Sequence, residues 1–226
     1  MRLLIDLDNT LVDRAGAFRR WAGDFAVENQ MAVRVGANPN RHDDPDAVAW
    51  LVEIDRNGYA PRAEVAAAIL GRYHLDTEVD GMVDRLLFEH VPYVEAYEGV
   101  LERLKGQDVV VVTNGTVAQQ EAKLRQAGLD RYLGSAVISE RIGAKKPDPA
   151  VFLAALAGAD PRAAWMVGDH PEADIAGARA VGLRTAWVSH GHEWPFDWRP
   201  DVIGSTTAHA LDAIARAGAN YLPVPP

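Results

Sequence analysis

The chain has 226 residues, a formal net charge of −9 and no cysteine. Its length suits one or two domains with a substantial core. The absence of cysteine excludes a disulfide scaffold, thiol catalysis and cysteine zinc sites. The negative charge argues against broad binding to nucleic acid polymers or anionic membranes, although a small anion can still bind at a local positive site. The first residues lack the apolar run of a signal peptide, and no stretch approaches the ~20 apolar residues of a membrane span, so we expect a soluble, cytoplasmic protein.

Short, continuous apolar runs recur along the chain, and most are followed by a loop and then by a helical pattern. Uninterrupted apolar runs are typical of strands that are covered on both faces. The helical pattern of 117–127 ends at Gly128, the pattern through 157 begins at Asp148 and Pro149, and the pattern of 172–181 ends at Gly182. This alternation predicts an α/β fold with a doubly wound (Rossmann-like), mostly parallel sheet. The predicted strands contain residues 3–5, 109–112, 136–138, 165–167, 185–188 and, more weakly, 201–203.

One region, residues 14–92, interrupts this alternation because it has helical patterns and no comparable strand. We therefore expect two domains, a catalytic core of residues 1–13 and 93–226 and an inserted helical cap of residues 14–92. Two polar loops of the cap are candidates for facing a site, but an ordinary surface loop is the preferred interpretation of both. The helical patterns are 15–31, 45–55, 62–73 and 78–90, and the loops contain His42, Asp43 and Asp44, and Arg56, Asn57 and Tyr59.

Reactive side chains gather where the predicted strands end. Ligands of open α/β sheets bind at the carboxyl ends of the strands, so these side chains are the candidate site. Each has an ordinary explanation as a cap or turn residue, but their common position favours a function. They are Asp6 and Asp8 after 3–5, Thr113 and Asn114 after 109–112, Lys146 before the helix at Pro149, and Asp169 and Asp174 after 165–167.

Several carboxylates at one point would repel each other in the absence of a cation. Ligation by oxygen alone suits a hard divalent ion, for which we expect Mg²⁺, and Mg²⁺ keeps coordination sites for water and for the oxygens of a phosphate. Lys146 would hold a second face of the same anion. Thr113 and the backbone N–H groups near Asn114 would bind its remaining oxygens.

The sequence around these residues resembles the four ordered motifs of the haloacid dehalogenase-like (HAD) hydrolase superfamily. One motif alone would be weak, whereas four in order, each at a strand end or before a helix, are specific. The likeness covers the whole core, and the insertion falls where that family has its C1-type cap. The motifs are Asp6-Leu7-Asp8-Asn9-Thr10, Thr113-Asn114-Gly115, Lys146-Pro147 and Gly168-Asp169-His170-Pro171-Glu172-Ala173-Asp174.

The resemblance implies a role for each of these positions. Asp6 would be the nucleophile that forms an aspartyl-phosphate, and Asp8 the general acid and then the general base. Thr113, Asn114 and Lys146 would bind the phosphoryl group. Mg²⁺ would be held by Asp6, the backbone carbonyl of Asp8 and Asp169, with Asp174 supporting it directly or through water.

The second acid, Asp8, favours one chemistry within the family. Dehalogenases of the superfamily need no acid for a halide and typically lack it, whereas phosphatases must protonate an alkoxide. We therefore predict a phosphatase acting on a small phosphorylated metabolite. Phosphomutase and dehalogenase remain alternatives, as does, from another class, a non-catalytic phosphate-binding module. The substrate and the oligomeric state are not readable from the sequence.

Overall fold

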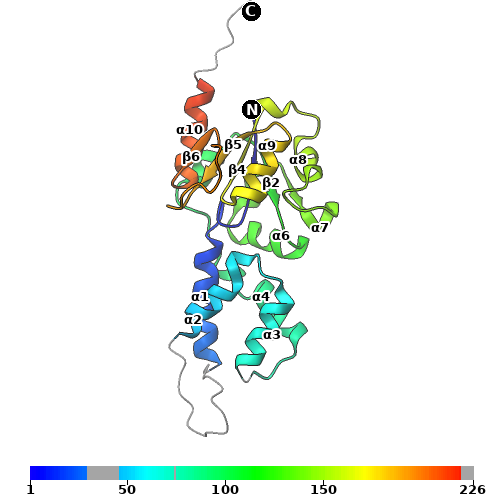
Figure 1. Ribbon diagram of the computed structural model, residues 1–226, viewed down its shortest axis with the longest axis vertical. Coiled ribbons are helices and arrows are strands. Elements are labelled where there is room, and N and C mark those ends of the chain that lie inside the picture. Colours follow the sequence, from blue (N-terminus) through cyan, green and yellow to red (C-terminus); the bar gives the residue numbers. More distant parts are fainter. Residues whose placement is uncertain (30–45, 74, 220–226) are drawn as a thin grey trace, which may run out of the picture. The chain divides into compact units, whose positions relative to one another are not determined.

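The computed structural model describes residues 1–29, 46–73 and 75–219. The chain divides into two compact units, a core unit of Met1–Asp13 with Ala96–Pro226 and a helical unit of Arg14–Glu95 (Figure 1). The boundary after Glu95 compares with an expected one after residue 92. The loop with His42, Asp43 and Asp44 lies outside the described residues.

The core unit contains a six-stranded sheet in the order β3-β2-β1-β4-β5-β6. Every neighbouring pair of strands is parallel. The doubly wound parallel sheet that the sequence predicts is therefore confirmed. The strands are β1 (Arg2–Ile5), β2 (Asp108–Thr113), β3 (Ser135–Ile138), β4 (Ala164–Gly168), β5 (Arg184–Val188) and β6 (Val202–Gly204).

Both faces of this sheet are buried, which explains why the strands have continuous apolar runs. On one face, Leu4, Val110 and Met166 pack with α8 and α9 in a single hydrophobic cluster. Their neighbours along the strands, such as Leu3 and Ile5, point to the opposite face and are buried as well. The central strands are thus covered on both sides, and only their ends are open to a ligand.

The helices of the core unit largely follow the predicted pattern. Thr116 caps α6 by accepting a hydrogen bond from the backbone N–H of Gln119, and Asp148 caps α8 in the same way through Ala150. The expected helix of 172–181 instead consists of a π-helical turn, Pro171–Ala176, followed by α9. The helices are α5 (Val100–Leu104), α6 (Val117–Gln126), α7 (Ser139–Ile142), α8 (Pro149–Leu156), α9 (Gly177–Ala180) and α10 (Thr207–Ala219).

The helical unit has a hydrophobic core of its own, which includes Phe18, Trp21 and Leu51. A buried ion network lies at its edge. The Asp55 carboxylate accepts hydrogen bonds from both Arg14 and Arg62, and these two guanidinium groups hold the pKa of Asp55 below its ordinary value although burial alone would raise it. The described helices are α1 (Arg14–Glu28), α2 (Ala47–Asp55), α3 (Arg62–Arg72) and α4 (Val79–Phe88).

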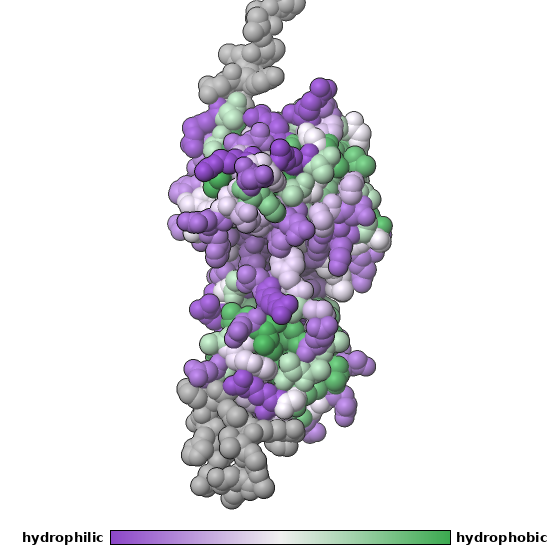
Figure 2. Space-filling model, in the orientation of Figure 1, coloured by the Kyte–Doolittle hydropathy of each residue, from purple (hydrophilic) through white to green (hydrophobic). Residues whose placement is uncertain are grey.

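The visible surface is hydrophilic over much of the core unit, whereas hydrophobic residues gather over part of the helical unit (Figure 2). Large apolar side chains that reach solvent, such as Leu153 and Phe196, are of the scattered kind that ordinary protein surfaces carry. Within the described residues, no helix combines the length and the apolar character needed to cross a membrane.

Candidate active site

The topology brings three motifs to one edge of the sheet. β1 lies between β2 and β4, with Ile5 aligned to Val111 on one side and to Val167 on the other. The backbone N–H of Asp6 extends the ladder by donating to the carbonyl of Val167, at 2.9 Å. Because all strands are parallel, the residues that follow β1, β2 and β4 converge at the carboxyl edge, where ligands of such sheets bind.

Three carboxylates meet at this edge around one ammonium group. Oxygen atoms of Asp6, Asp169 and Asp174 all lie within 4.8 Å of one another. The Lys146 ammonium contacts the Asp6 carboxylate and lies 2.6 Å from Oδ1 of Asp174. Asp6, Asp174 and Lys146 are all buried. The cluster therefore contains three acids for one base, and all of these side chains except the partly exposed Asp169 are buried.

The electrostatics of the cluster follow from this imbalance. Burial raises the pKa of Asp6 to about 7, the nearby Lys146 opposes that rise, and the charges of Asp174 and Asp8 add to it. The pKa of Asp169 is raised as well, by burial and then by the charge of Asp6. Burial would lower the pKa of the Lys146 ammonium, but the carboxylates of Asp174 and Asp6 outweigh it and raise that pKa. Lys146 thus remains a cation, but its single positive charge does not balance the negative charges of Asp6 and Asp169 as well as that of Asp174.

These residues fit a divalent cation. All the donors are carboxylate oxygens, the chemistry that Mg²⁺ prefers, and a dication at this point would stabilise the charged form of Asp6, whose pKa is raised by burial and then by the neighbouring acids. The residues that would hold the ion are Asp6, Asp169 and Asp174. The Asp8 carboxylate is not part of this cluster, so its backbone carbonyl is the group left for the expected contact with the metal.

Local structure sets the Asp174 carboxylate against the end of β4. In the π-helical turn, Oδ2 of Asp174 accepts a hydrogen bond from the backbone N–H of His170, at 3.0 Å. A Cβ atom on Gly168 would lie only 2.3 Å from this same oxygen. Only glycine leaves room there, which explains the Gly-Asp pair at the strand end.

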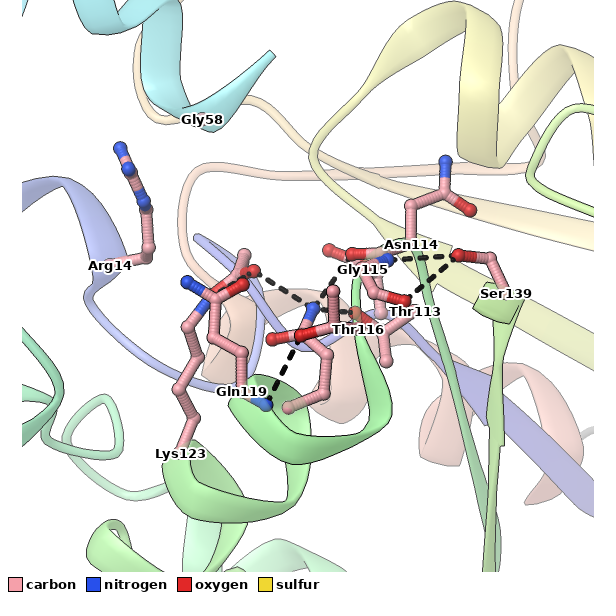
Figure 3. Close-up of polar contacts among 12 residues, drawn as sticks. Arg14, Gly58, Thr113, Asn114, Gly115, Thr116, Gln119, Lys123 and Ser139 are labelled. Carbon is pink, nitrogen blue, oxygen red and sulfur yellow. Dashed lines mark hydrogen bonds and ion pairs between the residues drawn. The ribbon is translucent and has the colours of Figure 1, made fainter. Parts of the chain in front are cut away.

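The Asn114 side chain ties the loop after β2 to the segment around Lys146. The Asn114 side chain accepts from the backbone N–H of Lys146, at 2.8 Å, and donates to its carbonyl, at 3.1 Å. Ser139 Oγ accepts from the backbone N–H of Gly115, at 2.9 Å, across the contact drawn in Figure 3. The Asn114 side chain therefore positions Lys146, and the phosphate contact expected near Asn114 is left to its backbone N–H, as a prediction.

Asp8 lies in a tight turn that continues from β1. The backbone N–H groups of Leu11 and Val12 both donate to the Leu7 carbonyl, at 2.9 and 3.0 Å, and Asn9 takes a left-handed conformation with φ of 57°. The turn keeps Asp8 close enough to Asp6 for its charge to raise the pKa of that residue. Asp8 and Asp6 are thus neighbours in one site with different partners.

Among the partners of Asp8 are two residues that the sequence patterns do not single out. Lys123 Nζ lies 2.8 and 2.7 Å from the two oxygens of the Asp8 carboxylate. Gln120 Nε2 lies 3.2 Å from Oδ2 of Asp8 and 2.7 Å from Oγ1 of Thr113. One available signal is their spacing, because Gln120 and Lys123 share a face of α6 with the apolar Leu124, so polar groups occupy the buried side of that helix.

The comparisons with known proteins agree with this architecture. A family model described as haloacid dehalogenase-like hydrolase matches residues 2–182. Glyceraldehyde 3-phosphate phosphatase from Pyrococcus furiosus is 34% identical over 210 residues, which cover 84% of this chain and 80% of that protein. Phosphoserine phosphatase from Thermus thermophilus is 38% identical over 110 residues, which cover 48% of this chain and 44% of that protein. The chain thus matches less than half the length of this relative, as it does for the ribulose-1,5-bisphosphate 5-phosphatase of Halopiger xanaduensis, of which 46% is covered.

Solved structures show the same fold. HAD-hydrolase YfnB from Bacillus subtilis, whose structure is bound to magnesium, has a TM-score of 0.72 at 21% identity and covers 96% of this chain and 97% of its own. A 2-haloacid dehalogenase from Pseudomonas syringae has a TM-score of 0.57 at 29% identity and covers 96% and 98%. With the family model matching most of its length, and with the motifs gathered at one edge of a parallel sheet, the chain belongs to the haloacid dehalogenase-like hydrolase family.

Proposed function

We propose that the protein is a Mg²⁺-dependent phosphomonoester hydrolase that forms an aspartyl-phosphate at Asp6. One observation carries the proposal: the buried Asp6 carboxylate lies beside Lys146, within reach of the metal-binding acids and next to a second acid, Asp8. A nucleophile, a cation for the phosphoryl oxygens, a metal site and a proton donor are thus available together.

The reaction runs in two steps on this chain's own residues. An oxygen of Asp6 attacks phosphorus, the bond to the ester oxygen breaks, and the leaving oxygen takes a proton from Asp8. Asp8, now ionised, accepts a proton from water, whose oxygen attacks phosphorus and releases inorganic phosphate from Asp6. Bound Mg²⁺ would neutralise charge on Asp6 and on the phosphoryl oxygens.

Lys146 and Thr113 would bind the phosphoryl oxygens during both steps. Lys146 is a buried, permanent cation, so its charge is preorganised for the transition state. Uncatalysed hydrolysis of phosphate monoesters is extremely slow, so such fixed charge is a large part of what the reaction needs. The helical unit, residues 14–95, would act as the cap that selects the leaving group.

The presence of Asp8 favours hydrolysis of phosphate esters over dehalogenation, because a halide leaves without a proton. The names of the relatives agree, since those found by sequence include phosphatases of phosphoserine, glyceraldehyde 3-phosphate and ribulose-1,5-bisphosphate. We propose a small phosphorylated metabolite as the substrate of this chain. A phosphomutase shares the second acid and remains the second candidate.

The test is release of inorganic phosphate from a panel of sugar phosphates, phosphoserine, phosphoglycolate and nucleotides. We expect turnover with Mg²⁺ and none after EDTA treatment, with activity returning when Mg²⁺ is added back. A haloacid is the matched control for dehalogenation, and an isomerised sugar phosphate would reveal a mutase. Halide release without phosphate release would overturn the proposal.

A further inference from the structure

We propose that Gln120 and Lys123, one helical turn apart on α6, are positioning residues that hold the Asp8 carboxylate and the Thr113 hydroxyl in their reactive orientations. This inference deepens the proposed function and rests on it. Neither residue belongs to the four motifs that define the site. Both face inward from the helix, and both are buried.

The Lys123 ammonium group contacts both oxygens of the Asp8 carboxylate. The ammonium nitrogen lies 2.7 Å from one oxygen and 2.8 Å from the other, so the carboxylate cannot rotate without losing a charged contact. The Lys123 side chain is 2% exposed, whereas that of Asp8 is 24% exposed. The lysine therefore contacts Asp8 from the protein interior and leaves an open side of the carboxylate for a substrate or a water molecule.

Gln120 connects Asp8 to the phosphate-binding loop. Its amide nitrogen lies 2.7 Å from Oγ1 of Thr113, 2.7 Å from the Asn114 carbonyl and 3.2 Å from Oδ2 of Asp8. All three oxygens can accept, so the nitrogen end of the amide is the one that belongs there. Because Thr113 accepts from Gln120, its own hydroxyl hydrogen remains available to donate to a phosphoryl oxygen.

Holding the Gln120 amide in this position costs the protein some stability. Within the described part of the chain, Gln120 Oε1 is buried and has no hydrogen-bond partner. A Cβ atom on Gly115 would lie 2.9 Å from Gln120 Nε2, so the loop passes directly over the amide. Buried acceptors that lack a partner destabilise a fold, and a site that keeps one commonly does so for its function.

Packing alone does not explain these residues. An apolar side chain at either position would bury surface on α6 without the desolvation of an ammonium or an amide. The polar groups instead converge on Asp8, which must protonate the leaving oxygen in the first step and deprotonate water in the second. Holding Asp8 in one orientation serves both steps, because both protons are exchanged near the same phosphorus atom.

Two aryl esters separate positioning from folding. Phenolate is a stronger base than p-nitrophenolate, so phenyl phosphate needs a proton from Asp8 more than p-nitrophenyl phosphate does. For Lys123→Met we expect kcat on phenyl phosphate to fall about 100-fold or more. On p-nitrophenyl phosphate we expect a burst of one p-nitrophenolate per enzyme followed by slow turnover, because the aspartyl-phosphate still forms but water is poorly activated. The slow second step should lower KM together with kcat, so kcat/KM on p-nitrophenyl phosphate should change little.

Gln120→Met should act on both of its partners. We expect a higher KM for both esters and weaker competition by inorganic phosphate, since Thr113 loses its orientation, together with a lower kcat on phenyl phosphate. Lys123→Arg, which keeps the charge, should recover part of the activity. Arg125→Met and Gln126→Met alter exposed residues of the same helix and should resemble the wild type.

Circular dichroism and urea unfolding establish that each variant folds, and Lys123→Gln replaces Lys123→Met if the latter does not. Equal losses in the rate of the first, ester-cleaving step on the two esters, no burst on p-nitrophenyl phosphate, or losses no larger than those of Arg125→Met would overturn the inference while the wild-type turnover still supports the proposed function. A wild type that hydrolyses neither ester with Mg²⁺ present would overturn both.

Discussion

Replacing Asp6 by asparagine removes the proposed nucleophile and also removes a charge that the folded protein accommodates poorly. The pKa of Asp6 rises from 3.8 to about 7, first because of burial. A difference of about 3 in pKa between the unfolded and folded states corresponds to about 4 kcal/mol. Lys146 keeps its contact with Asp174 in the variant, so no buried cation is left without a partner.

The sign of the effect follows from proton binding. At pH 2 and below, both states of the wild type bind the proton, and Asp6 contributes nothing. As the pH rises to 7, the unfolded chain releases the proton while the metal-free folded protein retains it, so the wild type loses stability. Asp6→Asn has no such loss. The free energy of unfolding of the variant minus that of the wild type should therefore grow with pH, by about 4 kcal/mol over the whole range. Roughly 3 kcal/mol of this growth should occur between pH 5 and pH 8.

The assay is urea unfolding at pH 5, 6, 7 and 8 in EDTA, followed by circular dichroism. Asp108→Asn, at a half-exposed surface carboxylate, is the control and should show no comparable trend. Adding Mg²⁺ should stabilise the wild type more than Asp6→Asn, and the variant should release no phosphate at any pH. A stability difference that is independent of pH would refute the electrostatic reasoning, and retained turnover would refute the assignment of the nucleophile.

Two further variants test the buried charges. Lys146→Met leaves the acids of the site without their ammonium partner, so in EDTA at pH 8 the free energy of unfolding should fall by about 3–5 kcal/mol. Urea unfolding measures this, and a loss no larger than that of Lys145→Met, at an exposed lysine, would contradict it. Asp55→Asn leaves Arg14 buried without its counter-charge, and it should destabilise the helical unit by about 3–5 kcal/mol at pH 7. Hydrogen exchange of the helical unit measures this loss, with Asp80→Asn as the control. The loss of stability should become smaller as the pH falls through the lowered pKa of Asp55, because the wild-type carboxylate then becomes neutral too. A loss that does not depend on pH would count against the ion network.

The sheet could be predicted because its signal is local. Runs such as Val109–Val112 are apolar at every position, which is typical of a strand covered on both faces, and the residues after parallel strands lie at the carboxyl edge. The strand order does the rest, since β1 has to lie beside β4 for Asp6 to meet Asp169, and beside β2 for both to lie near Thr113. The acids of the site are therefore recognisable from the sequence pattern alone, whereas their meeting at one point depends on the order of the strands.

Other features depend on contacts that no local pattern encodes. The segment 172–181 has a helical period, but Asp174 contacts the backbone of His170 and Gly177 packs closely on Phe152, and the chain adopts a π-helical turn there. Gln120 and Lys123 look like ordinary surface residues of a polar helix. Their burial becomes apparent only when Asp8, more than a hundred residues away in sequence, is placed opposite them.

The turn around Val12 has a consequence for how the chain can vary. Val12 forms an antiparallel bridge with Ala96, and the backbone N–H of Tyr97 donates to the Leu11 carbonyl at 3.0 Å. The chain thus leaves the core unit and returns to it at a single hydrogen-bonded point, where paired Cα atoms lie about 5 Å apart. The core unit already holds these two chain ends together, and so it meets the entropic cost of bringing them close. A segment inserted between them therefore needs only two termini that lie near each other. Helical segments of very different length and sequence can therefore replace one another at this point without changing the register of β1 and β2.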